Sequence, residues 1–284
     1  MTPGETFARE SIRRDTFALP TGDGLVVRGD ALLPPGATTA VVLCHGFLGF
    51  GRWAFFPYVA EKIAEAGMHA IAFDFSGSGV GPDRESFTEP DAFETNTYTK
   101  ELRDLALVEE EAHARGWLGE TYGLFGHSRG GGIAVLHAAR SPRVGALVTW
   151  ASVALLGRWP AHEIPRWRER GWLEVKSTRA GDALRIGTGV LDELDRLGRT
   201  ELDVLAAAGR LAIPWLIVHG TKDDKVPVDD ARLLHDAAAR TRPELLLVDD
   251  ADHTFGARHP LGVPSVALAE ATRDTVAFLD GVLA

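Results

Sequence analysis

A serine lies in the middle of a glycine-rich hexapeptide, Gly-His-Ser-Arg-Gly-Gly, at residues 126–131. Residues 121–125 before it are apolar and aromatic, as in a buried strand, and residues 133–140 after it are typical of a helix. Glycines two positions to either side of Ser128 let the chain turn sharply, because a Cβ there would collide with neighbouring backbone. Such a turn presents the serine hydroxyl beside the first amides of the helix. The pattern predicts that Ser128 is a nucleophile; the alternative is an ordinary glycine-rich turn.

The acid that would complete such a site is expected shortly after residue 220. A serine alcohol is a weak nucleophile, so it needs a base, and the base needs an acid to orient it. Residues 216–220 are typical of a buried strand, and the loop that follows carries Asp223 and Asp224. The string His-Gly-x-x-Asp-x-x-Val-Pro fits Asp223, which we therefore favour, leaving Asp224 as a solvated turn residue.

His253 is the candidate base. Residues 244–248 predict another strand, and His253 lies on the loop that follows, where a base can reach a serine at the same edge of the sheet. His259 is the rival candidate, although it lies further along the loop and precedes a proline. His219 ends its own strand and is expected to pack there. Any single histidine can instead be a surface or helix-capping residue.

Two backbone amides are predicted to stabilise negative charge at the reacting atom. Residues 40–44 form an apolar strand, and a His-Gly-Phe loop follows it. A loop of this kind brings one backbone N–H to an oxyanion hole, and the residue after the nucleophile brings the second. The two donors would be the amides of Phe47 and Arg129. Alternatively, this glycine-rich loop only ends the strand and has no part in catalysis.

Five features occur along the chain in one order: His45-Gly46, the Asp74-x-x-Gly77-x-Gly79 turn, Gly126-x-Ser128-x-Gly130, His219-Gly220-x-x-Asp223 and His253. In this order the chain resembles the serine-nucleophile branch of the α/β-hydrolases, over nearly its whole length. Within that superfamily it is most similar to small microbial carboxylesterases such as feruloyl and cinnamoyl esterases. The resemblance implies that Asp74 has a structural role.

The resemblance implies the α/β-hydrolase fold, with a mostly parallel sheet of roughly eight strands, helices on both faces and an inserted cap. The sequence agrees, because predicted strands alternate with predicted helices, including helices near 57–66, 96–115 and 264–283.

One long interval interrupts that alternation. Residues 1–151 and 211–284 are assigned to the core, and residues 152–210, too long for an ordinary connection, to a cap or lid. Residues 190–208 within it are expected to be helical. The interval also holds three of the seven tryptophans, Trp159, Trp167 and Trp172. We expect at least one of them to face the substrate, although for any single tryptophan packing of the cap is the simpler explanation.

Composition narrows the class of protein. The 284 residues include 40 acidic and 30 basic side chains, a formal charge of −10, which argues against nucleic-acid binding. A soluble monomer or small homo-oligomer acting on a small molecule is expected, with no membrane partner. The single cysteine, Cys44, excludes an internal disulfide, and no spacing fits a metal or nucleotide site, so no cofactor is expected.

Two features bear on where the protein works. Residues 1–5 are polar and acidic without an apolar signal segment, which favours the cytoplasm. One asparagine and no glutamine, with 25 arginines against 5 lysines, fit a thermophilic source or equally a GC-rich genome.

Three functions fit these residues. The first is a serine carboxylesterase that cleaves small esters through an acyl-enzyme. The second is another acyl hydrolase with the same triad: a thioesterase, peptidase, lactonase or C–C hydrolase. The third is a non-catalytic binding protein on a hydrolase fold, which has no need to keep Ser128, Asp223 and His253 together.

Overall fold

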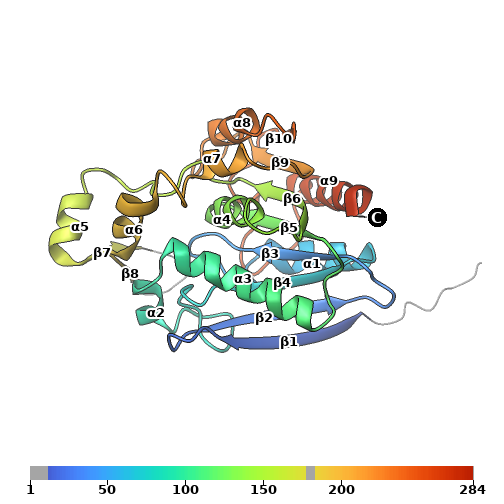
Figure 1. Ribbon diagram of the computed structural model, residues 1–284, viewed down its shortest axis with the longest axis horizontal. Coiled ribbons are helices and arrows are strands. Elements are labelled where there is room, and N and C mark those ends of the chain that lie inside the picture. The colour runs from blue at the N-terminus through green and yellow to red at the C-terminus, as the bar shows by residue number, and fades with distance from the viewer. Residues whose placement is uncertain (1–11, 177–182, 284) are drawn as a thin grey trace, which may run out of the picture.

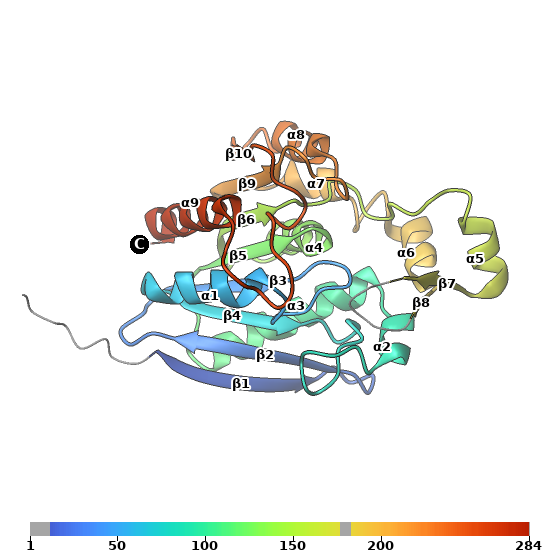
Figure 2. The same cartoon turned by 180° about the vertical axis from the view of Figure 1, so that it is seen from behind.

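The computed structural model describes residues 12–176 and 183–283, and its centre is an eight-stranded sheet of order β1-β2-β4-β3-β5-β6-β9-β10 (Figures 1 and 2). The strands are β1 (Arg13–Pro20), β2 (Val26–Leu33), β3 (Ala40–Cys44), β4 (His69–Asp74), β5 (Tyr122–His127), β6 (Val144–Trp150), β9 (Trp215–Gly220) and β10 (Glu244–Val248). The strands from β4 to β10 in this order are parallel, while β1 and β2 pair antiparallel. The predicted mostly parallel sheet of roughly eight strands is confirmed.

The central strands are apolar on both faces because helices cover both. Every residue of β3, β5 and β9 is buried, whereas the edge strand β1 alternates between exposed and buried positions near its end. Helices α1 (Phe55–Glu65) and α9 (Val266–Leu283) cover one face, in front in Figure 2. Helices α3 (Tyr98–Ala114), α4 (Arg129–Ala138) and α8 (Val228–Ala237) cover the other.

The 152–210 segment leaves the sheet after β6 and returns before β9. It contains α5 (Ile164–Arg170), β7 (Trp172–Val175), β8 (Leu184–Gly187), α6 (Gly189–Leu197) and α7 (Val204–Ala208). In both views α5, α6 and the β7–β8 hairpin lie beyond the end of the sheet, next to the short helix α2 (Pro90–Glu94), and α7 returns to the body (Figures 1 and 2).

The single helix expected over 190–208 is wrong, since the chain forms two helices there. Gly198 ends α6, and Asp203 begins α7 by accepting a hydrogen bond from the Ala206 amide at 2.9 Å. An N-cap within a helical pattern starts a new helix, because its side chain replaces an intrahelical partner.

None of the helices in the described ranges is long and apolar enough to cross a membrane. Residues 1–5, whose polarity favoured the cytoplasm, lie outside those ranges.

Candidate active site

Ser128 lies between β5 and α4 in a backbone conformation that side chains rarely adopt, with φ 57° and ψ −121°. The glycines around it explain how the turn closes. A Cβ at Gly126 would stand 2.4 Å from the Gly130 carbonyl oxygen, and a Cβ at Gly130 would stand 2.3 Å from that of His45. Neither position can hold a side chain, so the glycine spacing read from the sequence has a steric cause.

His253 and Asp223 lie beside Ser128 in one chain of hydrogen bonds. His253 Nε2 is 3.0 Å from the Ser128 hydroxyl oxygen, and His253 Nδ1 is 2.7 Å from Asp223 Oδ2. The three residues follow β5, β9 and β10, whose carboxyl ends meet at the same edge of the sheet. The structure therefore brings together all three residues that the sequence proposed for a triad.

Asp223, not its neighbour, faces the histidine. Its Oδ1 accepts hydrogen bonds from the amides of Lys225 and Val226, at 2.8 and 2.9 Å. Burial would raise the pKa of Asp223, but hydrogen bonds from His219 and His253 outweigh it and hold that pKa below its usual value. Asp224 is exposed and pairs with the Lys225 ammonium.

Two other histidines have positions that the sequence did not reveal. His219, expected only to pack in its strand, is buried and donates from Nε2 to the Val226 carbonyl, 3.3 Å from Asp223 Oδ2. His127 Nε2 donates to the His253 carbonyl at 3.0 Å. Both therefore support residues of the hydrogen-bonded chain. The i,i+4 spacing of His219 and Asp223 is the signal that could have indicated the first contact.

His259, the rival base, lies elsewhere. Its Nδ1 accepts from the Ala54 amide at 3.0 Å, and its Nε2 is 3.5 Å from Glu85. The described contacts of His259 do not include Ser128.

The loop after β3 passes directly over the serine. A Cβ at Gly46 would stand 2.8 Å from the Ser128 Cβ. Burial lowers the pKa of His45, which favours a neutral ring that donates from Nδ1 to the Gly46 carbonyl and accepts at Nε2 from the Phe75 amide. Among the described residues, no acceptor takes a hydrogen bond from the amides of Phe47 or Arg129.

The Asp74 carboxylate, at the end of β4, is hydrogen-bonded to this loop. It accepts hydrogen bonds from the Gly51 amide and from Arg84 Nε, both at 2.6 Å. The first contact ties the end of the loop to β4, and the second ties Arg84, in the segment that follows β4, to the same carboxylate. This fits the structural role that the resemblance implied.

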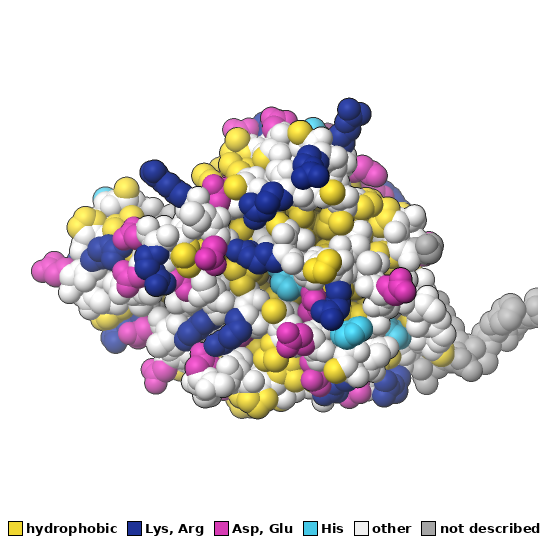
Figure 3. Space-filling model, in the orientation of Figure 1, with side chains coloured by type: hydrophobic (Ala, Val, Ile, Leu, Met, Phe, Trp, Pro, Cys, Tyr) yellow, Lys and Arg dark blue, Asp and Glu magenta, His cyan; other side chains and the backbone are white. Residues whose placement is uncertain are grey.

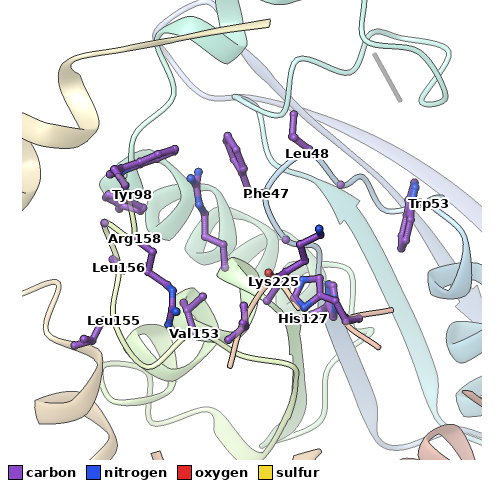
Figure 4. Close-up of a pocket in the computed structure, with 18 of the residues that line it drawn as sticks. Phe47, Leu48, Trp53, Tyr98, His127, Val153, Leu155, Leu156, Arg158 and Lys225 are labelled. Carbon is purple, nitrogen blue, oxygen red and sulfur yellow. Dashed lines mark hydrogen bonds between the residues drawn. The ribbon is translucent and has the colours of Figure 1, made fainter. Parts of the chain in front are cut away.

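A cavity of about 740 Å³ opens above Ser128 (Figure 4). Half of its lining residues are apolar or aromatic: Phe47, Leu48, Trp53, Phe56, Tyr98, Val153, Leu155, Leu156, Trp159 and Val226. Trp167 packs behind Trp159, with ring centroids 5.0 Å apart, and Trp172 stacks with Arg170 and Arg185 outside the lining. Of the three tryptophans in the 152–210 segment, Trp159 is the one that lines the cavity.

The described residues hold no group of His, Cys, Asp or Glu side chains that fits a metal ion.

Residues 36–256 match the family model described as serine aminopeptidase, S33. The chain belongs to this family of α/β-hydrolases. The predicted resemblance to α/β-hydrolases is thereby confirmed, and so is the fold.

Two curated relatives are similar to parts of this chain. 2,6-Dihydropseudooxynicotine hydrolase of Paenarthrobacter nicotinovorans is 25% identical over 237 residues, 83% of this chain and 57% of the relative. A serine hydrolase-like protein of Dictyostelium discoideum is 30% identical over 123 residues, 43% of this chain and 31% of the relative. The chain thus spans less than two thirds of the length of either relative.

Solved structures share the fold across nearly the whole chain. Est1E from Butyrivibrio proteoclasticus with bound ferulic acid has a TM-score of 0.71 at 20% identity, covering 94% of this chain and 99% of its own. The esterase domain of a Rhodothermus marinus protein has a TM-score of 0.67 at 19% identity, covering 96% and 100%. At these identities the likeness concerns the fold.

Proposed function

We propose that this hydrolase is a serine carboxylesterase that cleaves small carboxylic esters through an acyl-enzyme. The observation that carries the proposal is the continuous hydrogen-bonded chain of Ser128, His253 and Asp223 at the floor of an apolar cavity. The proposal is further supported by proteins of the same fold that are named as esterases.

The proposed reaction has two halves. His253 Nε2 accepts the proton of the Ser128 hydroxyl as its oxygen attacks the ester carbonyl carbon. The amides of Phe47 and Arg129 donate to the oxyanion that forms, the C–O bond breaks, and His253 returns the proton to the departing alcohol. Water then attacks the acyl-serine by the same path and releases the acid.

The aminopeptidase in the family description is the second candidate, and the cavity disfavours it. An aminopeptidase must receive the ammonium group of its substrate, for which a carboxylate is the natural partner. No Asp or Glu is found among the described residues that line the cavity. Thioesters, lactones and C–C bonds could react on the same groups, so a substrate panel has to separate them.

We also propose that the 152–210 segment acts as a cap over Ser128. The support is that its residues 153, 155–159 and 176 line the cavity together with Ser128. The finding that Trp159 is part of the wall agrees with a pocket shaped partly by this segment.

The test is covalent labelling of the serine. A fluorophosphonate should label the wild-type protein at Ser128, and Ser128→Ala should lose the label and about 10⁴-fold or more in kcat on p-nitrophenyl esters. Ser86→Ala, which changes an exposed serine away from the cavity, is the matched control and should retain both. If Ser128→Ala keeps more than about a tenth of the activity, Ser128 is not the nucleophile. Aminoacyl anilides and thioesters in the same assay rank the alternatives.

A further inference from the structure

The charged residues that line the cavity are all basic. Arg129, Arg158, Lys176 and Lys225 come from four separate places in the chain, and the described lining has no acidic residue. The chain as a whole has a formal charge of −10. On the face in Figure 3, by contrast, basic and acidic side chains lie interspersed. A cavity whose charge is opposite to that of its protein favours an anionic ligand.

Arg129 is the deepest of the four and carries unused donors. Its guanidinium lies 4.0 Å from the centre of the Phe47 ring, with Tyr98 and Trp159 also beside it, and the residue is 8% exposed. In the described part of the chain its one polar side-chain contact is from Nη1 to Glu101, at 3.4 Å. Nε and Nη2 have no protein partner there, yet neither is fully buried.

Glu101 contacts the Arg129 guanidinium from outside the cavity. Glu101 is buried but does not line the cavity, and it accepts a hydrogen bond from Asn96 at 2.8 Å. Burial raises the pKa of Glu101, an effect that the charge of Arg129 opposes. A single contact of 3.4 Å to a desolvated carboxylate leaves most of the guanidinium donors available on the cavity side.

The other three cations are nearer the rim. Arg158 pairs with the buried Asp230 at 2.5 Å, and Lys225 with the exposed Asp224 at 2.9 Å. Arg158 and Lys225 lie on different sides of the cavity in Figure 4. Exposed pairs such as that of Lys225 contribute little free energy, so its ammonium can exchange partners readily. The rim therefore attracts anions, and Arg129 is the group that can bind one directionally.

We propose that the substrates of this hydrolase are esters that carry a carboxylate, and that Arg129 binds that carboxylate through its cavity-side N–H groups. The planar guanidinium fork matches a carboxylate in a way that a point charge does not. The aromatic wall would hold the rest of the molecule. The inference rests on the proposed esterase function and adds the substrate class: half-esters of dicarboxylic acids, or hydroxy acids acylated on the hydroxyl oxygen.

Matched ester pairs test the class. Monomethyl terephthalate against methyl 4-methylbenzoate places a carboxylate or a methyl group on the acyl side, and 4-carboxyphenyl acetate against 4-tolyl acetate does so on the alcohol side. In at least one pair the wild type should favour the anionic member by about tenfold or more in kcat/KM, as expected for hydrogen bonds to a charged group. Equal rates, or a preference for the neutral member in both pairs, overturn the proposal.

Substitutions at Arg129 and Glu101 test whether Arg129 causes the preference for the anionic ester. Arg129→Met combined with Glu101→Gln removes both charges together, so that no buried carboxylate is left without its partner, and keeps the Arg129 amide. The anionic-to-neutral ratio should fall about tenfold in this double variant. Lys222→Met is the control, since Lys222 is an exposed cation on the Lys225 loop but outside the lining, and its ratio should stay within about twofold of wild type. An unchanged ratio in the double variant contradicts the role of Arg129.

Binding to Ser128→Ala separates this proposal from the esterase proposal. Calorimetry with the uncleaved members of both ester pairs should show tighter binding of the anionic member in at least one pair, and Arg129→Met/Glu101→Gln in the same background should remove the difference. If the difference is present while fluorophosphonate fails to label the wild type, the anion site stands and the esterase proposal fails. If labelling succeeds and the two members bind equally in both pairs, the anion site is wrong.

Discussion

At the scale of single residues, the choice between two adjacent aspartates is decided by backbone contacts. Asp223 accepts two amide hydrogen bonds from the turn that follows it, and these aim its second oxygen at His253. Asp224 points to solvent and pairs with a lysine. Because Asp223 stays ionised, it can hold the His253 ring with Nδ1 protonated and Nε2 free to accept a proton.

This contrast predicts unequal effects of the same substitution. Asp223→Asn should lower kcat/KM on a neutral p-nitrophenyl ester by roughly 10⁴-fold, since an amide favours the wrong histidine tautomer. Asp224→Asn, the matched control one residue away, should change it by less than about threefold. Steady-state kinetics on both variants at one pH makes the comparison. Equal losses, or a larger loss at Asp224, would reverse the assignment of the acid.

At the scale of secondary structure elements, one buried carboxylate joins α3 to the first residue of β5 and to the last turn of α4. Glu109 on α3 accepts hydrogen bonds from the Tyr122 hydroxyl on β5 and from His137 on α4, both at 2.8 Å. Ser141 and Arg143, in the loop after α4, donate to its other oxygen at 3.0 Å. Burial alone would raise the pKa of Glu109, but these donors outweigh it and lower the pKa to about 2.

The lowered pKa predicts how stability depends on pH. A carboxylate whose pKa falls on folding adds stability above its unfolded value of 4.5, and this is lost as pH falls through the folded value near 2. The shift corresponds to about 3 kcal/mol at neutral pH. Glu109→Gln should therefore lower the free energy of unfolding by ~2–3 kcal/mol at pH 7, and by progressively less between about pH 4.5 and pH 2.

Urea denaturation across that pH range provides the measurement, with Glu110→Gln as the control. Glu110 is adjacent in sequence but exposed, so its substitution should have little effect at any of these pH values. A difference between the Glu109 variant and wild type that stays constant from neutral to acidic pH would show that ionisation of Glu109 contributes nothing.

The sequence predicts these elements well where the signal is local. The turn at Ser128 is specified by glycines within two residues, and the central strands by unbroken apolar runs. The contacts of His127 with His253, and of Glu101 with Arg129, join residues far apart in the chain, and no local pattern encodes them. A sequence pattern also did not separate α6 from α7, because Asp203 within a helical stretch is recognisable as a cap only from its hydrogen bond.

At the scale of the whole molecule, the 152–210 segment meets the body of the protein through Trp159. The indole nitrogen of Trp159 donates to the Tyr98 hydroxyl at 3.3 Å, and its ring packs edge-on against Phe47, with centroids 5.6 Å apart. Trp167, which belongs to the same segment, packs against the Trp159 ring. Tyr98 begins α3 and Phe47 follows β3, so one side chain joins the proposed cap to two elements of the core beside Ser128.

This arrangement predicts that the tryptophans of the segment differ in their effect on catalysis. Trp159→Ala should change kcat/KM by about tenfold for at least some members of a panel of acyl chain lengths, because it removes part of the cavity wall. Trp172→Ala, the matched control, should stay within about twofold, because Trp172 stacks between two arginines away from the cavity. Fluorophosphonate labelling of each variant checks that the site is intact. If Trp159→Ala is labelled normally and its acyl-chain profile follows that of wild type, Trp159 only joins the segment to the core, and substrate selection lies with the core residues of the wall.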